Sequence, residues 1–249
     1  MSRLTAELLG LQVRGRSPWR ERFAVVADRL VEAYGVPTLG NFRNPVKEIF
    51  YILLSAKTAD AQYRVTHRRL LEKFPTLTDL AKARIPSVRK CIESGGLAAT
   101  RAKQIIRLAK MLHSAGGKNP ARYLRALDSR AAFEFLLSLP GVGPKSAFCV
   151  MMYSLDWDVF PVDVNVQRIA ERMGAIPYGW NHVEGQRELA RLTPDGRSRE
   201  LHIVLVVHGR STCLPRNPKC ERCPIVDLCA FGNKRMKREL RLAGSRPKV

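Results

Sequence analysis

The stretch FEFLLSLPGVGPKSAFCVMMYSL, residues 133–155, decides the fold of this chain. It predicts an apolar helix, a tight turn at residues 140–143, and a second helix that begins at Pro144. Gly141 and Gly143 let the backbone turn sharply and approach another molecule closely. The free N–H groups at the start of the second helix would face outward, which favours an anion-binding helix-hairpin-helix. An ordinary corner between two helices has the same pattern.

The rest of the chain shows helical periodicity and no sustained strand pattern. Residues 46–56 predict a buried helix, and residues 99–115 predict an amphipathic helix that ends at a Gly-Gly pair. A short helix is expected over residues 86–93, because Pro86 suits a first helical turn. We therefore expect an all-α protein.

The charge of the chain points to its partner. There are 43 Lys and Arg against 22 Asp and Glu, a net charge of +21, which favours nucleic acid ahead of an anionic membrane surface. No apolar run approaches the roughly 20 residues of a membrane-spanning helix. The first residues lack the apolar core of a secretory signal, so we expect a cytoplasmic, nucleoid-associated protein.

Two residues near the hairpin are candidates for catalysis. Lys145 opens the second helix, where the helix field lowers the pKa of an amine and favours the neutral nucleophile. Asp163, in FPVDVNVQRIAERMG, can cap a helix that ends at Gly174. An exposed lysine and a purely structural N-cap explain the same two residues without catalysis.

Four of the six cysteines fall within 17 residues and suit a metal centre. Their spacing, C-x6-C-x2-C-x5-C, places four thiolates in one loop, as tetrahedral zinc or an iron–sulfur cluster requires. A single short knuckle favours [4Fe–4S] and leaves zinc open. The candidate ligands are Cys213, Cys220, Cys223 and Cys229. Cys91 and Cys149 stand in apolar surroundings and are expected to be buried free thiols.

Three separated motifs now coincide: LPGVGPK (139–145), VDVNVQRIA (162–170) and HGRSTC (208–213), which opens the cysteine array. Together they resemble the endonuclease III family of helix-hairpin-helix (HhH-GPD) DNA glycosylases. LLSAKTAD (53–60) and GGLAATRAKQI (95–105) are similar to two further segments of that family. The resemblance covers residues 20–231.

The resemblance implies a two-lobed all-α fold, a six-helix barrel that carries the hairpin and a helical iron–sulfur cluster domain. We expect the N-terminal extension and first helix, residues 1–35, to form part of the cluster domain. Residues 36–157 would form the barrel, residues 158–230 the cluster domain, and residues 231–249 a basic tail.

The resemblance also implies the chemistry of a bifunctional DNA glycosylase and abasic-site (AP) lyase of base excision repair that removes oxidised pyrimidines. Lys145 matches the family's nucleophile, Asp163 its catalytic aspartate, and the four clustered cysteines the ligands of a structural [4Fe–4S] cluster. A damaged base would leave the stack, and Lys145 would attack C1′ of its sugar to form a Schiff base. The expected partner is double-stranded DNA with a damaged base or abasic site, bound by a monomer.

Several positions depart from the family pattern. Lys57 stands where the family usually has a glutamine that fills the gap left by the extruded base, while Leu97 matches its apolar wedge. Gly141 and Gly143 match the DNA-binding hairpin. Pro144, Phe148 and Asn165 replace a basic residue, an asparagine and a histidine. These departures concern lesion preference more than the chemistry.

Three alternatives stay open. One is a related enzyme with weak or shifted lesion specificity that acts mainly as an abasic-site lyase. A second is an adenine glycosylase, a branch that usually lacks the lysine and adds a C-terminal domain, for which the 20 residues after Cys229 leave no room. The third, a noncatalytic iron–sulfur DNA-binding module, would need neither Lys145 nor Asp163.

Overall fold

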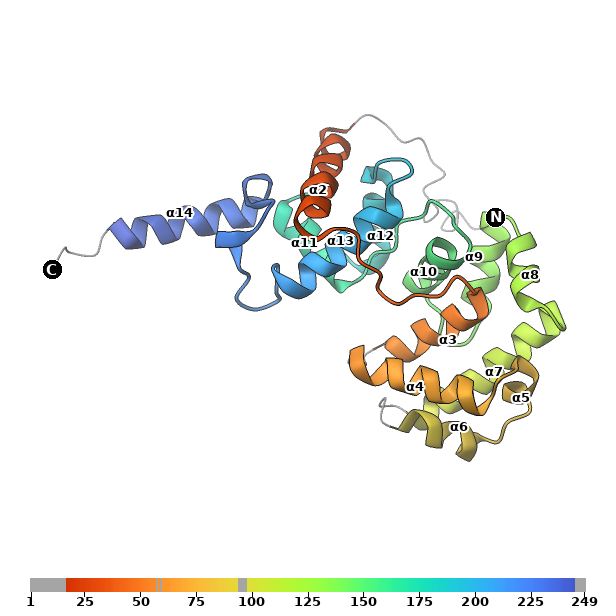
Figure 1. The fold of residues 1–249 in the computed structure, drawn as a ribbon. Helices are drawn as coiled ribbons and strands as arrows, with labels where there is room; N and C mark the ends of the chain where they lie inside the picture. The colour runs from red at the N-terminus through yellow and green to blue at the C-terminus, as the bar shows by residue number, and fades with distance from the viewer. Residues whose placement is uncertain (1–16, 57, 59, 94–97, 245–249) are drawn as a thin grey trace. The chain divides into compact units, whose positions relative to one another are not determined.

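The computed structural model describes residues 17–56, 58, 60–93 and 98–244, and every regular element in these residues is helical (Figure 1). The expectation of an all-α protein is confirmed. Within the same residues, no helix is long and apolar enough to cross a membrane.

The chain divides into two compact units. One unit is Gly40–Trp157, which we call the hairpin unit; the other, the cysteine unit, combines the described residues before Gly40 with those from Asp158 on. The hairpin unit contains α3 (Pro45–Ser55), α4 (Asp60–Lys73), α5 (Leu77–Ala81), α6 (Ile85–Ile92), α7 (Ala98–Gly116), α8 (Pro120–Ala126), α9 (Ser129–Ser138) and α10 (Pro144–Ser154). The cysteine unit contains α2 (Pro18–Tyr34), α11 (Val164–Met173), α12 (His182–Leu192), α13 (Ser198–Ser211), the 3-10 turns η2 (Cys220–Arg222) and η3 (Val226–Leu228), and α14 (Ala230–Gly244).

In the hairpin unit, α3 and α10 are the most buried helices and pack against each other. Asn44 caps α3 by accepting hydrogen bonds from two N–H groups of its first turn. Phe148 of α10 stacks on Phe133 of α9 with ring centroids 4.8 Å apart. Phe148, one of the departures from the family pattern, is therefore a core residue of this unit.

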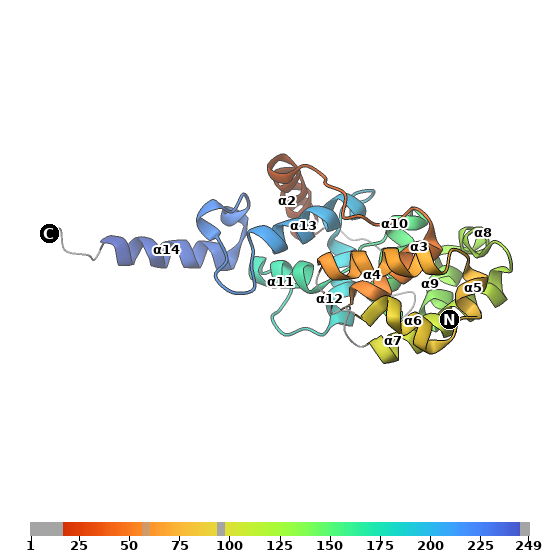
Figure 2. The same cartoon turned by 60° about the horizontal axis from the view of Figure 1, so that its bottom comes forward.

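In the cysteine unit, helices far apart in sequence share one core. α13 packs against both α2 and α11, and buried apolar side chains from all three meet around Leu30, Ile169 and Leu205. The first part of α14 packs on α11 and the 3-10 turns, and the helix then extends beyond them (Figures 1 and 2). The segments that come before and after the hairpin unit in the sequence therefore fold together into one unit.

The predicted helices are confirmed with boundaries shifted by about a residue. Residues 46–56, 86–93 and 99–115 correspond to α3, α6 and α7. Asp163 is the N-cap of α11, and Gly174 ends that helix with φ +85°, a left-handed conformation that favours glycine. Cys91 and Cys149 are buried, as expected, and neither forms a disulfide within the described residues.

Candidate functional site

The hairpin turn joins α9 to α10, and Gly141 shapes it. The turn is closed by the Val142 N–H, which donates to the Leu139 carbonyl at 3.1 Å. Gly141 has φ +83°, and a Cβ atom there would lie 2.7 Å from Cδ1 of Leu53 in α3. Backbone conformation and packing therefore both require glycine at this position.

Gly143 differs from the expectation that both glycines serve the turn. Its backbone is extended (φ −99°, ψ 180°), a conformation open to any residue. A Cβ atom there would meet nothing within 4 Å among the described residues. As the N-cap of α10 it offers no capping side chain, so the N–H groups of the first turn donate no hydrogen bond to a side chain of their N-cap residue. The glycine leaves room for an approaching molecule.

Lys145 is half-buried in the first turn of α10. The buried carboxyl group of Glu48, on α3, interacts electrostatically with the charge of Lys145. Glu48 is 0% exposed and accepts hydrogen bonds from the Phe42 N–H at 2.7 Å and from the Asn41 amide at 2.5 Å. Burial raises the pKa of Glu48 to about 7, while those hydrogen bonds and the charge of Lys145 act in the opposite direction. The hairpin unit therefore holds an acid near its candidate nucleophile.

Asp163 has its carboxylate turned onto the start of its own helix. Oδ1 accepts from the N–H groups of Asn165 at 2.8 Å and Val166 at 2.9 Å. Oδ2 accepts from the side-chain amide of Asn165 at 3.1 Å. Three donors stabilise the charged carboxylate and fix its orientation.

Asn165 and Arg168 connect this carboxylate to the cysteine segment. Arg168 Nη2 donates to Asn165 Oδ1, to the Gly209 carbonyl and to the Cys213 carbonyl, each at 2.9 Å. A Cβ atom on Gly209 would lie 2.6 Å from Cβ of Asn165. The glycine of HGRSTC thus leaves space for the side chain that supports Asp163.

Arg172, one turn further along α11, holds the same segment at its cysteine. Its Nη1 donates to Cys213 Sγ at 3.2 Å and to the Leu214 carbonyl at 2.8 Å, and its Nη2 donates to the Pro215 carbonyl at 2.9 Å. The guanidinium also lies over the ring of Phe231, 5.0 Å from its centroid. α11 therefore begins at Asp163, and near its other end Arg172 donates a hydrogen bond to the first of the four cysteines.

The four clustered cysteines line a single cavity in the cysteine unit, together with Arg172, His208 and apolar side chains. Burial raises the pKa of Cys223 to about 12, and the Gly232 N–H donates to Cys229 Sγ at 3.3 Å. No group of three or more His, Cys, Asp or Glu in the described residues is arranged to hold a single metal ion. Four soft ligands around one cavity, with N–H donors to two sulfurs, fit a [4Fe–4S] cluster.

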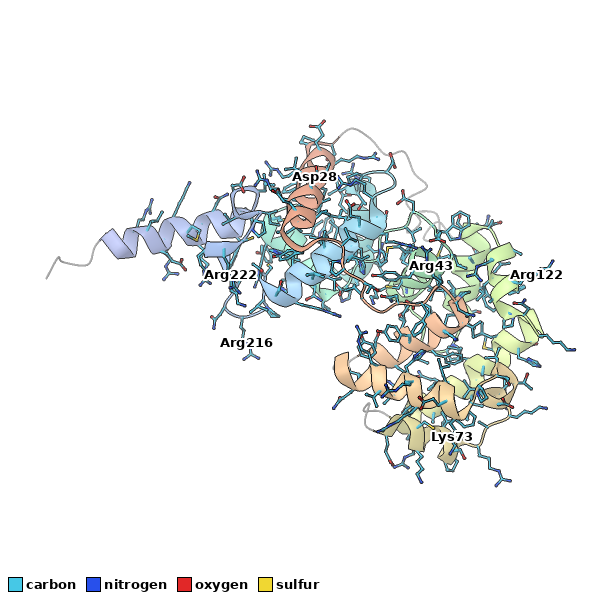
Figure 3. The ribbon with its side chains drawn as sticks, viewed as in Figure 1. Asp28, Arg43, Lys73, Arg122, Arg216 and Arg222 are labelled. Atoms are coloured by element: carbon cyan, nitrogen blue, oxygen red, sulfur yellow. The ribbon has the colours of Figure 1, made fainter. Side chains whose placement is uncertain are left out.

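The cysteine loop carries exposed basic side chains. Arg216 and Arg222 are exposed, and Figure 3 shows Arg216 pointing away from the loop into solvent. Such side chains suit contacts to phosphate that carry no sequence information.

The sequence-predicted residues fall in both units. Lys145, Gly141 and Gly143 belong to the hairpin unit, while Asp163 and the four cysteines belong to the cysteine unit. Lys57 and Leu97 lie outside the described residues.

Sequence reasoning missed the role of the arginines of α11. Arg168 and Arg172 are four residues apart, so they share a helix face, and that spacing was the available signal. Most of their acceptors lie some forty residues later in the chain, at Gly209 and from Cys213 to Pro215.

Comparison with known proteins finds two matching families. Residues 50–194 match the family described as HhH-GPD superfamily base excision DNA repair protein. Residues 213–229 match the iron-sulfur binding domain of endonuclease III. The second match spans the four clustered cysteines.

Individual proteins agree with these families. Endonuclease III of Escherichia coli K12 is 30% identical over 195 residues, covering 78% of this chain and 87% of that protein. Endonuclease III of Bacillus subtilis is 30% identical over 198 residues, covering 79% and 86%. A trapped endonuclease III–DNA covalent intermediate has a TM-score of 0.76 at 27% identity, covering 87% of this chain and 98% of that one.

Proposed function

The chain belongs to the endonuclease III family of base excision repair DNA glycosylases with AP lyase activity, and we propose that Lys145 is its nucleophile, Asp163 its catalytic carboxylate and oxidised pyrimidines its substrates. The observation that carries the proposal is the hairpin. Its turn is shaped by Gly141, its helix start is open at Gly143, and Lys145 follows directly.

Lys145 would act as a neutral amine on DNA with an extruded base. Its Nζ forms a bond to C1′ as the bond from C1′ to the base breaks, and the base leaves with the electron pair and takes up a proton. Opening of the sugar ring then gives a Schiff base. Loss of a proton from C2′ and cleavage of the C3′–O bond complete the β-elimination, which cuts the strand on the 3′ side.

Asp163 would be charged when the amine attacks. Three hydrogen bonds to its oxygens favour the carboxylate, which can accept the proton of the attacking amine and stabilise positive charge on the sugar. A purely structural N-cap needs only the two bonds to Oδ1. The additional bond from Asn165 to Oδ2 supports the catalytic assignment.

The proposed partner is double-stranded DNA that contains a damaged base or an abasic site. The first turn of α10 would receive a phosphate, since Gly143 leaves that helix start uncovered. The net charge of +21 would strengthen binding to the backbone regardless of sequence. We propose that the protein acts as a monomer in the cytoplasm, in association with the nucleoid.

The [4Fe–4S] cluster would be bound by Cys213, Cys220, Cys223 and Cys229. Its contribution is structural: four sulfur ligands tie the loop from residue 213 to residue 229 into one piece. Arg168 and Arg172 then hold that loop against α11, the helix that begins at Asp163. The cluster would therefore help to keep the carboxylate in place.

Borohydride reduction tests the proposed nucleophile. The wild-type protein should form a covalent adduct with DNA containing an abasic site, and peptide mapping should place the adduct on Lys145. Absence of an adduct would refute the lyase assignment. An adduct on another residue would refute the role of Lys145 alone.

A panel of duplexes with different lesions tests the substrates, with base release and β-elimination scored separately. We expect base release to be fastest from duplexes with oxidised pyrimidines such as thymine glycol. Efficient β-elimination at abasic sites with little base release from any lesion would instead support the abasic-site lyase.

Iron analysis of protein purified under argon tests the proposed cluster. Zinc without iron in the purified protein would contradict it.

A further inference from the structure

Arg101, on the first turns of α7, is a buried cation that the repair chemistry does not use. It is only 5% exposed. Its Nη1 donates to the Leu54 carbonyl at 3.2 Å and to Thr58 Oγ1 at 2.8 Å, and its Nη2 donates to the Ala56 carbonyl. A buried guanidinium is costly unless such acceptors are present. These contacts explain how the charge is tolerated but not what it serves.

The acceptors of Arg101 all belong to the end of α3 and the turn after it. Leu54 lies in the last turn of α3, where carbonyls lack partners within the helix and the helix dipole is negative. Ala56 is the C-cap residue, and Thr58 donates back to its carbonyl through Oγ1 at 3.2 Å. One guanidinium therefore fixes the chain on both sides of position 57.

The hairpin reaches the same junction. A Cβ atom on Gly141 would lie 2.7 Å from Leu53 Cδ1 and 3.3 Å from Gln104 Nε2. Leu53 precedes an acceptor of Arg101 in α3, and Gln104 lies three residues after Arg101 on α7. The end of α3, the start of α7 and the hairpin turn thus meet within the hairpin unit.

We propose that Arg101 is a positioning residue for lesion recognition, because its guanidinium holds the turn that flanks Lys57 in register with α7 and the hairpin. The inference rests on the proposed function, since duplex DNA with an extruded nucleotide is the ligand that these segments would meet. A lysine keeps the charge but lacks the planar fork that reaches several acceptors together. Arg101 therefore serves the opening of the duplex and not the Schiff-base chemistry.

The first test compares R101K and R101Q on two substrates, a lesion in duplex DNA and a preformed abasic site in single-stranded DNA. The single strand requires no opening of a duplex. Because small displacements of positioning groups cost up to about a hundredfold in rate, we expect R101K to lower kcat/KM on the duplex lesion by about tenfold and R101Q by more. Both variants should stay within about twofold of wild type on the single strand.

Arg107 supplies the matched control, because it is an exposed arginine on the same helix. R107K and R107Q make the same chemical changes and should leave both activities within about twofold of wild type. T58A removes one acceptor without altering the buried charge, and it should lower duplex activity in the same direction by a smaller factor. It also tests the proposal if R101Q does not fold.

The second test reads duplex opening without chemistry. In the K145Q background, 2-aminopurine placed opposite an abasic site should fluoresce more strongly when saturating protein disturbs its stacking. Adding R101K should reduce that increase, and adding R107K should not. Equal loss on both substrates, or an unchanged fluorescence increase with R101K, would overturn the proposal. Failure of the proposed function would appear differently, as a wild-type protein that forms no adduct with abasic DNA.

Discussion

The starts of α10 and α11 carry the two candidate catalytic residues, and they are built in opposite ways. α10 follows Gly143, which has no side chain, and the space outside its first turn is open. α11 begins at Asp163, whose own carboxylate occupies its N–H groups. The open start can receive an anion from another molecule, whereas the closed start holds an anion of the protein.

This difference suits the charge that each residue needs. Lys145 lies in the first turn of α10, where the field of the helix disfavours a positive charge. Asp163 lies at a similar end, where the same field and three hydrogen bonds favour its charge. A single residue at each N-cap position, glycine or aspartate, therefore decides whether the helix start lacks a capping side chain or holds a carboxylate.

Removing the amine at the open start should have the largest effect. K145Q keeps a polar side chain, one atom shorter than lysine, and removes the nucleophile, so strand cleavage should fall by about ten-thousandfold or more. Binding of duplex DNA should change by less than about threefold, because one of many cations is lost. Gel-based cleavage and fluorescence anisotropy measure the two quantities. Equal losses of cleavage and binding would mean that Lys145 serves binding alone.

At the closed start, D163N should separate the cap from the catalysis. Asparagine caps helices as well as aspartate does, but it loses the hydrogen bond from the Asn165 side chain, so the free energy of unfolding should fall by about 1 kcal/mol. Without the charge, Schiff-base formation should slow by about a thousandfold. D163A is the companion variant and should lose about 1 kcal/mol of stability in addition. If D163N retained wild-type trapping rates, Asp163 would be a cap and nothing more.

Glu48, the acid that interacts with Lys145, predicts a pH-dependent difference in stability. Its pKa in the folded protein, about 7, lies above the ordinary 4.5. The contribution of Glu48 to the free energy of unfolding is therefore full below pH 4.5 and is lost as the pH rises through 7. Burial lowers the pKa of His67 in the same unit to about 4, so its contribution is full above pH 6.5 and is lost as the pH falls through 4. The free energy of unfolding thus depends on pH in opposite directions through these two groups, and the two effects partly cancel in the wild type.

E48Q should remove the pH dependence of stability that is due to Glu48. Relative to wild type, its free energy of unfolding should increase between pH 4 and pH 8 by an amount on the order of 3 kcal/mol. Urea denaturation across this range measures the difference. A difference that does not change with pH would show that Glu48 keeps an ordinary pKa in the folded protein.

The two hairpin glycines should give smaller effects than the changes above, and the clearest contrast. G143A places a methyl group in open space, so stability should change by less than about 0.5 kcal/mol, while affinity for abasic duplex DNA falls by about tenfold. G141A meets a positive φ and the side chain of Leu53, and should cost about 2 kcal/mol of stability. If G143A bound DNA normally, the open start of α10 would not be a phosphate site.

The fold class, the hairpin, the cap at Asp163 and the cysteine array could be predicted from the sequence because each depends on residues close together in the chain. Turn glycines, N-caps and ligand spacing act over a few residues, and helical periodicity over one or two turns. The role of Gly143 was only partly predicted. Its sequence context does not show that its backbone is extended while that of Gly141 is left-handed.

By itself, the sequence determined the candidates for the proposed chemistry: a lysine after a glycine turn, an aspartate at a helix start and four clustered thiols. Only the tertiary structure decided what supports them. Arg168 reaches Cys213, Arg101 reaches Leu54, and Glu48 acts on Lys145, all across long separations in the chain. Such pairs follow from helix packing, since a buried charge finds its partners only when separate helices meet.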